Sequence, residues 1–292
     1  MRLLLYLMIA LLAESAGVMP ANAGSADLSQ VMIDVSSHND LTALLGDVPN
    51  RKIELVVARV SIGLGTPDGA YEKNMQLLRS AAPQILRGAY HALYATSSGK
   101  AQAAEFLGHV RGACRPGEKI LLAVDWERPQ LKKKMVDAAP TATLREFVDQ
   151  VLASTGHQPV VYTDPIVISA NRDTLAGWAN PPPLWLATYY AKIWRSRDCH
   201  KQPEGQNGFT CSNSIHGLVF PDVNDFSPWS DWVFWQFSAA TPGNPEYLLR
   251  KFKDMPVDVS YFGGSREEFR AFFEANAVKC EAIVVPQLTV SR

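Results

Sequence analysis

The sequence lacks most of the features that would associate it with nucleic acid, a metal or a dinucleotide. Its 292 residues carry a formal net charge of −1, so no basic face for nucleic acid is predicted. It has no Cys-x-x-Cys and no His-Glu-x-x-His pattern, and its six His are scattered, which leaves a zinc site without support. Gly63-Leu64-Gly65 is not followed by the third glycine of a dinucleotide loop. We expect no metal, no cofactor and no nucleic-acid partner.

Long apolar runs are also missing after the N-terminus, since none reaches the roughly 18 residues of a membrane-spanning helix. The N-terminus has a basic residue at Arg2, an apolar stretch over 3–12 and the small-x-small ending Ala21-Asn22-Ala23. This order is typical of a secretory signal peptide over 1–23 with cleavage before Gly24; an uncleaved interfacial anchor is the alternative. We expect a secreted or periplasmic monomer without stable membrane insertion.

Cysteine is scarce, and the four that occur fit an oxidising compartment in which disulfides persist. Four cysteines allow three pairings. Cys199 and Cys211 enclose a short polar segment. We therefore favour that bridge, with Cys114 to Cys280 as its complement.

The chain does contain alternating strand-like and helix-like segments, which are typical of βα units and a parallel sheet. Eight strands are predicted, over 31–35, 55–61, 85–91, 120–126, 159–163, 184–189, 232–237 and 257–260. Apolar positions three and four apart predict helices over 71–82, 99–111, 142–153 and 266–276. The last of these has a capping-box start at Ser265 and Glu268.

This order indicates an α/β fold, an irregular TIM-like (β/α) barrel of roughly (β/α)5(β)3, because the late strands have too few residues between them for full helices. We expect a single barrel domain over 24–278 and a C-terminal tail over 279–292. The segment at about 191–230 lacks periodicity and is rich in Gly, Asn, Ser and Pro. Loops of that length are usually functional or disordered, and the two cysteines in its middle favour an ordered lid or rim.

Two carboxylates follow the apolar run Ile120–Val124, in Asp125-Trp126-Glu127. Residues i and i+2 of a strand point to the same face, with Cα atoms about 6.6 Å apart. Two such carboxylates do not both ionise easily, so one should keep its proton to a higher pH, as a general acid requires. Trp126 should point the other way and pack under a helix. A solvated surface strand is the alternative.

Carboxylates also occur on the first and last predicted strands, at Asp34 and Asp258. The first and last strands of a closed barrel are neighbours, so both side chains are predicted to face the same opening as Asp125 and Glu127. A loop-capping role is the alternative for each.

Eight short motifs lie along the predicted strands in one order: Ile33-Asp34-Val35-Ser36, Ala58-Arg59-Val60-Ser61, Gly88-Ala89-Tyr90-His91, Val124-Asp125-Trp126-Glu127, Val161-Tyr162-Thr163, Leu184-Trp185-Leu186-Ala187-Thr188-Tyr189, Trp235-Gln236-Phe237 and Val257-Asp258. Together they resemble the glycoside hydrolase family 25 muramidases, the Chalaropsis-type lysozymes, across nearly all of the chain after the N-terminal segment.

The resemblance implies an irregular β/α barrel that cleaves the β-1,4 bond between N-acetylmuramic acid and N-acetylglucosamine in peptidoglycan glycan strands. It places Glu127 at the position of the general acid, Asp125 at that of its partner, and Asp34 and Asp258 at those of the other two acids of the cleft. It also implies retention of anomeric configuration, with the substrate's N-acetyl group as nucleophile and Asp258 or Asp125 orienting that group. The identity of the nucleophile stays open.

One position departs from the family pattern. Members commonly carry an acidic residue near the end of the second strand, in a pattern like Ala-x-Glu-Gly, whereas this chain reads Val60-Ser61-Ile62-Gly63. Ile62 cannot pair with a charge or bind a sugar hydroxyl. With the long 191–230 segment, it motivates a non-catalytic glycan-binding barrel as one alternative. A chitinase-like glycosidase, whose Asp-x-Glu also ends the fourth strand, is the other.

Aromatic rings at strand ends are candidates for sugar binding, because sugars present apolar faces that stack on rings. Tyr90, Tyr162, Tyr189 and Trp235 lie at or near the ends of predicted strands. We predict substrate contacts for all four, with packing in the core as the alternative.

Overall fold

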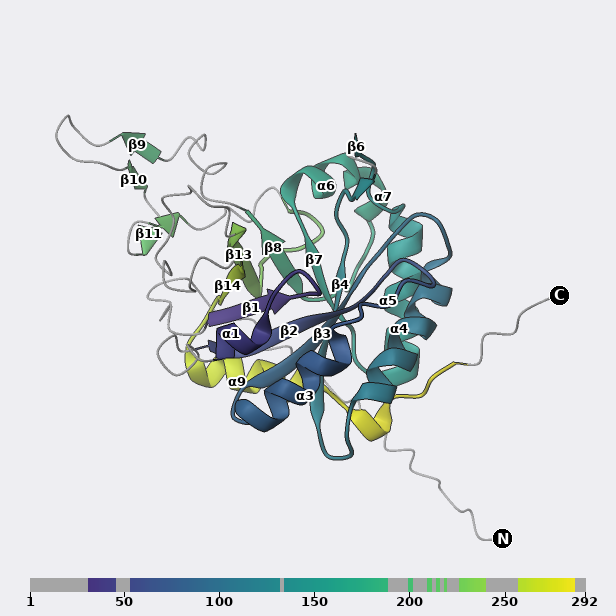
Figure 1. Cartoon of the computed structure of the whole chain (residues 1–292). Helices are drawn as coiled ribbons and strands as arrows, with labels where there is room; N and C mark the ends of the chain where they lie inside the picture. The colour runs from purple at the N-terminus through teal and green to yellow at the C-terminus, as the bar shows by residue number, and fades with distance from the viewer. Residues whose placement is uncertain are drawn as a thin grey trace, which may run out of the picture.

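Eight strands close into a barrel in the computed structural model of the chain (Figure 1). They are β1 (Val31–Val35), β2 (Ile53–Ile62), β3 (Leu86–Ala92), β4 (Lys119–Asp125), β7 (Val160–Thr163), β8 (Leu184–Ala187), β13 (Phe234–Ala239) and β14 (Asp258–Phe262). Neighbouring strands are parallel except at β14, which is antiparallel to both β1 and β13. Pairing of β4 with β7 completes the ring. The predicted irregular (β/α) barrel is therefore confirmed.

The structure describes residues 31–45, 53–131, 134–188, 199–201, 209–211, 214–215, 218–219, 226–239 and 257–286. The predicted signal peptide, most of the 191–230 segment and the last six residues of the predicted tail lie outside these ranges. No described helix is long and apolar enough to cross a membrane.

Helices cover the outside of the barrel (Figure 1). They are α1 (Leu41–Leu45), α3 (Tyr71–Ala81), α4 (Gly99–Ala113), α5 (Thr141–Thr155), α6 (Pro165–Ala170), α7 (Arg172–Leu175) and α9 (Arg266–Asn276). The predicted α9 is confirmed with its bounds, and both hydrogen bonds of its capping box form between Ser265 and Glu268.

Strand residues alternate between two apolar layers, as the period of two in a strand requires. On β2, Val56 and Ala58 belong to the layer beneath the helices, whereas Leu55 and Val57 belong to the layer inside the barrel. Phe269 of α9 joins the inner layer, so α9 covers the end of the barrel at which the parallel strands begin. The opposite end is left for a site.

Among the described residues, short strands also form three two-stranded hairpins outside the barrel ring. They are β5 (Gln130–Leu131) with β6 (Lys134–Met135), β9 (Cys199–Lys201) with β10 (Phe209–Cys211), and β11 (Ser214–Ile215) with β12 (Leu218–Val219). The register of β9 and β10 places the backbones of Cys199 and Cys211 opposite each other; their side chains lie outside the description.

The C-terminal segment packs against the barrel. After α9, β15 (Val278–Lys279) pairs antiparallel with β4, and a 3-10 turn, η2, spans Cys280–Ala282. A disulfide joins Cys280 to Cys114 at the end of α4, which confirms the second predicted pair. The chain is thereby fixed to the barrel beyond α9.

Candidate active site

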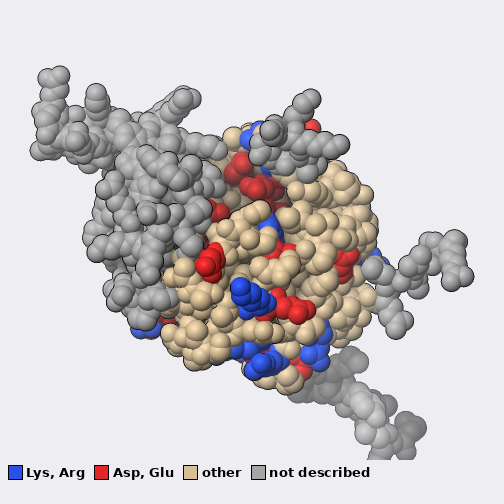
Figure 2. All heavy atoms as spheres, in the orientation of Figure 1, with Lys and Arg blue, Asp and Glu red and all other residues tan. Residues whose placement is uncertain are grey.

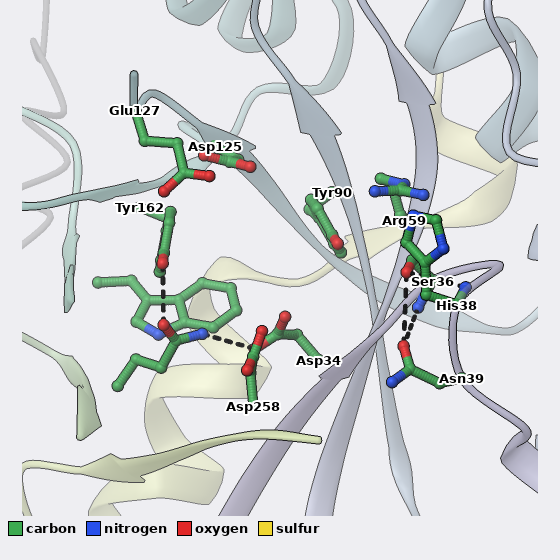
Figure 3. A pocket seen from close by; sticks show the side chains of 12 residues that line it. Asp34, Ser36, His38, Asn39, Arg59, Tyr90, Asp125, Glu127, Tyr162 and Asp258 are labelled. Carbon is green, nitrogen blue, oxygen red and sulfur yellow. Dashed lines mark hydrogen bonds between the residues drawn. The ribbon is translucent and has the colours of Figure 1, made fainter. Parts of the chain in front are cut away.

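A polar pocket of about 320 Å³ opens where the parallel strands end (Figure 3). Figure 2 shows acidic side chains gathered in the upper part of the face seen there. The pocket is lined by Asp34, Ser36, His38, Asn39, Arg59, Tyr90, Asp125, Glu127, Tyr162, Trp185, Gln236 and Asp258. All four acids predicted from the sequence are among them. This is also the end of a β/α barrel at which catalytic residues are usually found.

Strand register brings Asp34 and Asp258 together. They are direct partners across the antiparallel pair of β1 and β14. Residues opposite each other in such a pair have Cβ atoms about 5 Å apart on the same face. In Figure 3 the two side chains lie beside each other on the floor of the pocket. The predicted closure of the barrel between its first and last strands is what creates this pair.

Asp125 and Glu127 approach the same pocket from the end of β4. Asp125 shares the inner face with Leu121 and Ala123, and its Oδ1 is buried without a hydrogen-bond partner among the described residues. Burial, followed by the negative charges of Glu127 and Asp34, raises the pKa of Asp125 well above its ordinary value. One carboxyl of this cluster therefore keeps its proton to a higher pH than an isolated aspartic acid.

Trp126, between these two acids, points to the opposite side of the strand. It is fully buried in the layer beneath the helices, and its Nε1 donates a hydrogen bond to the carbonyl oxygen of Ala139 at 2.6 Å. The expected orientation is confirmed. Burial of the indole fixes the backbone between Asp125 and Glu127.

A hydrogen-bonded chain supports Asp34. The hydroxyl of Tyr162 donates to Gln236 Oε1 at 2.8 Å, and Gln236 Nε2 donates to Asp34 Oδ2 at 2.9 Å. Burial and the charge of Asp258 raise the pKa of Asp34 well above its usual value, although the Gln236 hydrogen bond opposes this. Burial also raises the pKa of Asp258, to about 6. The two acids of the floor are thus harder to ionise than exposed aspartates.

Aromatic rings form part of the wall. Tyr162 and Trp185 are partners across β7 and β8 and meet edge to face with ring centroids 5.0 Å apart. Trp185 Nε1 donates to Ser260 Oγ at 2.9 Å. Tyr90 lines the pocket as well, and burial together with the charge of Asp34 raises its pKa well above its ordinary value. Its hydroxyl therefore stays protonated and can donate a hydrogen bond to a ligand.

Two of the four predicted aromatic contacts are not placed at the pocket. Trp235 is fully buried on the outer face of β13, where its Nε1 donates to the carbonyl oxygen of Thr188 at 2.9 Å. Gln236, one residue along the strand, faces the pocket instead. Tyr189 lies outside the described residues. Tyr90 and Tyr162 are the predicted aromatics that the structure brings to the pocket.

Sequence reasoning missed six lining residues, namely Ser36, His38, Asn39, Arg59, Trp185 and Gln236. Strand alternation contained the signal for some of them. Arg59 lies two residues after Val57, an inner-face residue of β2, and Trp185 lies two residues before Ala187, an inner-face residue of β8. The loop residues after β1 carried no such signal.

Ile62, the departure from the family pattern, ends β2 outside the pocket lining. Arg59 nevertheless has an acidic partner, Asp68, with 2.8 Å between Arg59 Nε and Asp68 Oδ2. Burial alone would raise the pKa of Asp68, but hydrogen bonds from the N–H groups of Ala70 and Ser37 and from Arg59 hold it below its usual value. The charge of Arg59 is thus compensated by an acid from the loop after β2.

No group of His, Cys, Asp or Glu in the described part of the chain is arranged to hold a metal ion. The arrangement is instead one of carboxyl groups and rings. Paired carboxyl groups with raised pKa values can act as general acid and general base in the cleavage of a glycosidic bond.

Comparison with known proteins agrees with this chemistry. A family model described as "Glycosyl hydrolases family 25" matches residues 33–244. The uncharacterized protein YegX of Escherichia coli K12 is 26% identical over 223 residues, which are 76% of this chain and 64% of that protein. YegX of the O6:H1 strain is 27% identical over 178 residues, 58% of this chain and 61% of that protein. The chain spans about three fifths of the length of these curated relatives.

Solved structures share the fold. A bacterial lysozyme from Streptomyces coelicolor has a TM-score of 0.55 and 21% identity, covering 83% of this chain and 95% of its own. A family 25 glycosyl hydrolase from Bacillus anthracis has a TM-score of 0.55 and 17% identity, covering 83% and 92%. A muramidase from Acremonium alcalophilum has a TM-score of 0.55 and 19% identity, covering 85% and 100%. Since the matched segment also includes most of the barrel and three of the four acids of the pocket, the chain belongs to glycosyl hydrolases family 25, a family of glycoside hydrolases.

Proposed function

We propose that the protein is a peptidoglycan hydrolase of the muramidase type, which cleaves the β-1,4 bond between N-acetylmuramic acid and N-acetylglucosamine. The observation that carries the proposal is the meeting of Asp125 and Glu127 with Asp34 and Asp258 in one pocket of a family 25 barrel. Fold relatives named as lysozyme and muramidase support the same substrate.

Glu127 is the proposed general acid. It donates its proton to the glycosidic oxygen while the bond from that oxygen to the anomeric carbon breaks. The oxygen of the substrate's own N-acetyl group bonds to the anomeric carbon in its place. Glu127 then takes a proton from water, which attacks the same carbon and restores the N-acetyl group, so configuration is retained.

Asp258 or Asp125 orients and stabilises the N-acetyl group. Both line the pocket with Glu127, and both have raised pKa values because they are buried. Asp34 is the proposed partner of Asp258, since the two are cross-strand neighbours. The chain from Tyr162 through Gln236 to Asp34 holds this floor in place.

The sugar rings are proposed to lie against Tyr90, Tyr162 and Trp185, which line the same pocket. Tyr189 stays a predicted contact, whereas Trp235 is left out because its indole is buried on the other face of the strand. The enzyme is proposed to act outside the cytoplasmic membrane after loss of residues 1–23. The Cys114–Cys280 disulfide supports an oxidising compartment.

Glu127→Gln tests the proposal, because the amide is nearly isosteric but cannot donate the proton. We expect the variant to release no new reducing ends from purified peptidoglycan and to unfold at the same temperature as the wild type. Glu72→Gln, on the exposed first turn of α3, is the matched control and should retain full activity. Measurable hydrolysis by Glu127→Gln would remove Glu127 from its proposed role.

A non-catalytic glycan-binding barrel is the second candidate, favoured by Ile62 at a position that is commonly acidic in the family. It predicts that the protein sediments with purified cell walls and releases no reducing ends. A chitinase-like enzyme would instead release sugars from chitin and none from peptidoglycan. Assays on purified peptidoglycan and on chitin therefore distinguish the muramidase, the glycan-binding protein and the chitinase-like enzyme.

A further inference from the structure

The pocket has a second end that the proposed cleavage chemistry does not use. It is formed by Ser36, His38 and Asn39 of the loop after β1 and by Arg59 of β2, which lie together in Figure 3, away from Glu127. Arg59 is the only Lys or Arg among the described lining residues. The pocket is therefore electrically uneven, with carboxyl groups at one end and a guanidinium at the other.

Arg59 is held in a fixed position by a buried acid. Its Nε donates to Asp68 Oδ2 at 2.8 Å, and the carboxylate of Asp68 is fully buried, whereas the side chain of Arg59 is 14% exposed. Asp68 is itself fixed by N–H donors of Ser37, at 3.1 Å, and Ala70, at 2.9 Å. An arginine secured in this way loses little conformational freedom when it binds a ligand.

Part of the guanidinium is left for a ligand. Arg59 Nη2 donates to Ser37 Oγ at 3.3 Å, a long hydrogen bond, and Nη1 donates to no described residue. Planar guanidinium groups bind carboxylates with two parallel N–H donors, and such charge-assisted pairs are about twice as strong as neutral hydrogen bonds. A neutral sugar hydroxyl does not require a fixed cation.

The neighbouring loop leaves this end open to an acceptor. Asn39 Oδ1 accepts hydrogen bonds from the backbone N–H of Ser36, at 2.8 Å, and from Ser36 Oγ, at 3.4 Å. His38 is exposed and lines the pocket together with Arg59. Asn39 Oδ1 thus accepts hydrogen bonds from within the loop, while the guanidinium of Arg59 and the imidazole of His38 line the pocket.

We propose that this end of the pocket, centred on Arg59 and held by Asp68, is a subsite for a carboxylate carried by the glycan chain. On a peptidoglycan strand such a group is the free carboxylate of the lactyl substituent or a carboxylate of the peptide attached to it. This inference rests on the proposed function for the identity of the glycan. It adds that substrate selection depends on a negative charge beside the sugar and not on the sugar rings alone.

The test compares two peptide-free glycan strand preparations, one with lactyl carboxylates and one in which these are converted to methylamides. For the wild type we expect a KM about tenfold lower on the carboxylate strands, with kcat within twofold. Arg59→Gln should raise KM about tenfold on the carboxylate strands and leave it unchanged on the amide strands. Asp68→Asn should lose part of the preference, because it loosens Arg59 without removing its charge.

The source of the carboxylate is identified by a second pair of substrates, peptide-bearing strands with and without amidated peptide carboxylates. If only the peptide-bearing strands show a lower KM for the carboxylate form, the subsite binds a peptide carboxylate. If only the peptide-free strands show it, the subsite binds the lactyl carboxylate. Equal KM values of the wild type within both pairs would overturn the subsite. So would an Arg59→Gln variant that keeps the preference.

An electrostatic role of Arg59 on Asp125 alone is distinguishable. That role would shift the pH profile of kcat in Arg59→Gln and lower turnover equally on carboxylate and amide strands, which would contradict the subsite. If the wild type cleaves neither strand, the proposed function fails, and calorimetric binding of the same strands still tests the subsite. Tighter binding of carboxylate strands that is lost in Arg59→Gln supports it, and equal binding overturns it.

Discussion

Three carboxyl groups of the pocket have raised pKa values because of where the backbone places them. Asp34 and Asp258 are opposite each other on antiparallel strands, and Asp125 is buried beside Glu127 and Asp34. Burial is the largest cause of the raised pKa for Asp34, Asp125 and Asp258. The proposed exchange of a proton with the substrate near neutral pH depends on this property, which the surroundings of the carboxyl groups supply.

Asp258 provides a stability prediction with a definite sign. Its pKa of about 6 in the folded protein exceeds the ordinary 3.8, so the stabilisation from its proton is complete below about pH 4 and is lost as the pH rises through 6. Asp258→Asn removes this contribution. We expect the difference in free energy of unfolding between pH 4 and pH 7.5 to change by about 2 kcal/mol relative to wild type, as measured by denaturant titration.

The same variant should lose most of its hydrolytic activity, because it alters the floor of the pocket. Identical pH dependence of stability in Asp258→Asn and wild type would contradict the raised pKa. Wild-type hydrolysis rates would instead remove Asp258 from the reaction.

Gln236 is predicted to position Asp34. Gln236→Leu removes the N–H donor to Asp34 and the acceptor of the Tyr162 hydroxyl, so the pKa of Asp34 should rise further. We expect kcat to fall about tenfold and the acid limb of the pH profile of kcat/KM to move to higher pH. Gln76→Leu, on the exposed side of α3, is the control. An unchanged profile in Gln236→Leu would show that Asp34 does not depend on this contact.

Single elements differ in how well the sequence predicts them. The bounds of β1 and α9 agree with the prediction, because an apolar run defines β1 and a capping box starts α9. β13 was harder. Its pairing with β14 shifts register between Gln236 and Ser238, and both of its faces are buried, so aromatic content alone could not show that Trp235 faces the helices and Gln236 the pocket.

The contact between α4 and α5 depends on a glycine. A Cβ on Gly99 would lie 1.9 Å from the carbonyl oxygen of Thr143 and 2.7 Å from the backbone nitrogen of Phe147. Gly99→Ala must therefore push the two helices apart. We expect it to lower the free energy of unfolding by about 3 kcal/mol, a typical upper cost of overpacking, as measured by denaturant titration.

Gly112, in the same helix, is the matched control for Gly99. A Cβ there meets nothing within 4 Å, so Gly112→Ala should raise the free energy of unfolding by about 0.5 kcal/mol through helix propensity. Equal effects of the two substitutions would show that α4 and α5 are not in close backbone contact at Gly99.

At the scale of the whole molecule, the Cys114–Cys280 disulfide joins positions 166 residues apart and fixes the chain after α9 to the end of α4. Cross-links that close long loops restrict the unfolded chain strongly. We expect the double variant Cys114→Ala, Cys280→Ala to lose about 2 to 5 kcal/mol of stability. If this disulfide stabilises the fold, reductant should lower the midpoint of urea unfolding of the wild type and leave that of the double variant unchanged.

The position of the site followed from the sequence, and strand alternation contained a signal for Arg59, but the loop contacts that hold Arg59 could not be predicted. Carboxylates at strand ends predict a common opening once the barrel closes, and Asp34, Asp125, Glu127 and Asp258 are found there. Arg59 acquires its partner from the loop after β2, where Asp68 is selected by hydrogen bonds from Ser37 and Ala70. Such loop contacts have no periodicity, so the sequence pattern contained no signal for them.

The central claim is that this barrel cleaves the muramyl bond of peptidoglycan. Digestion of purified peptidoglycan in ¹⁸O-labelled water, followed by borohydride reduction and mass analysis of the fragments, tests it most directly. We predict that every new reducing end is N-acetylmuramic acid and carries one labelled oxygen at its anomeric carbon. New reducing ends on N-acetylglucosamine, or fragments without new reducing ends, would contradict the claim.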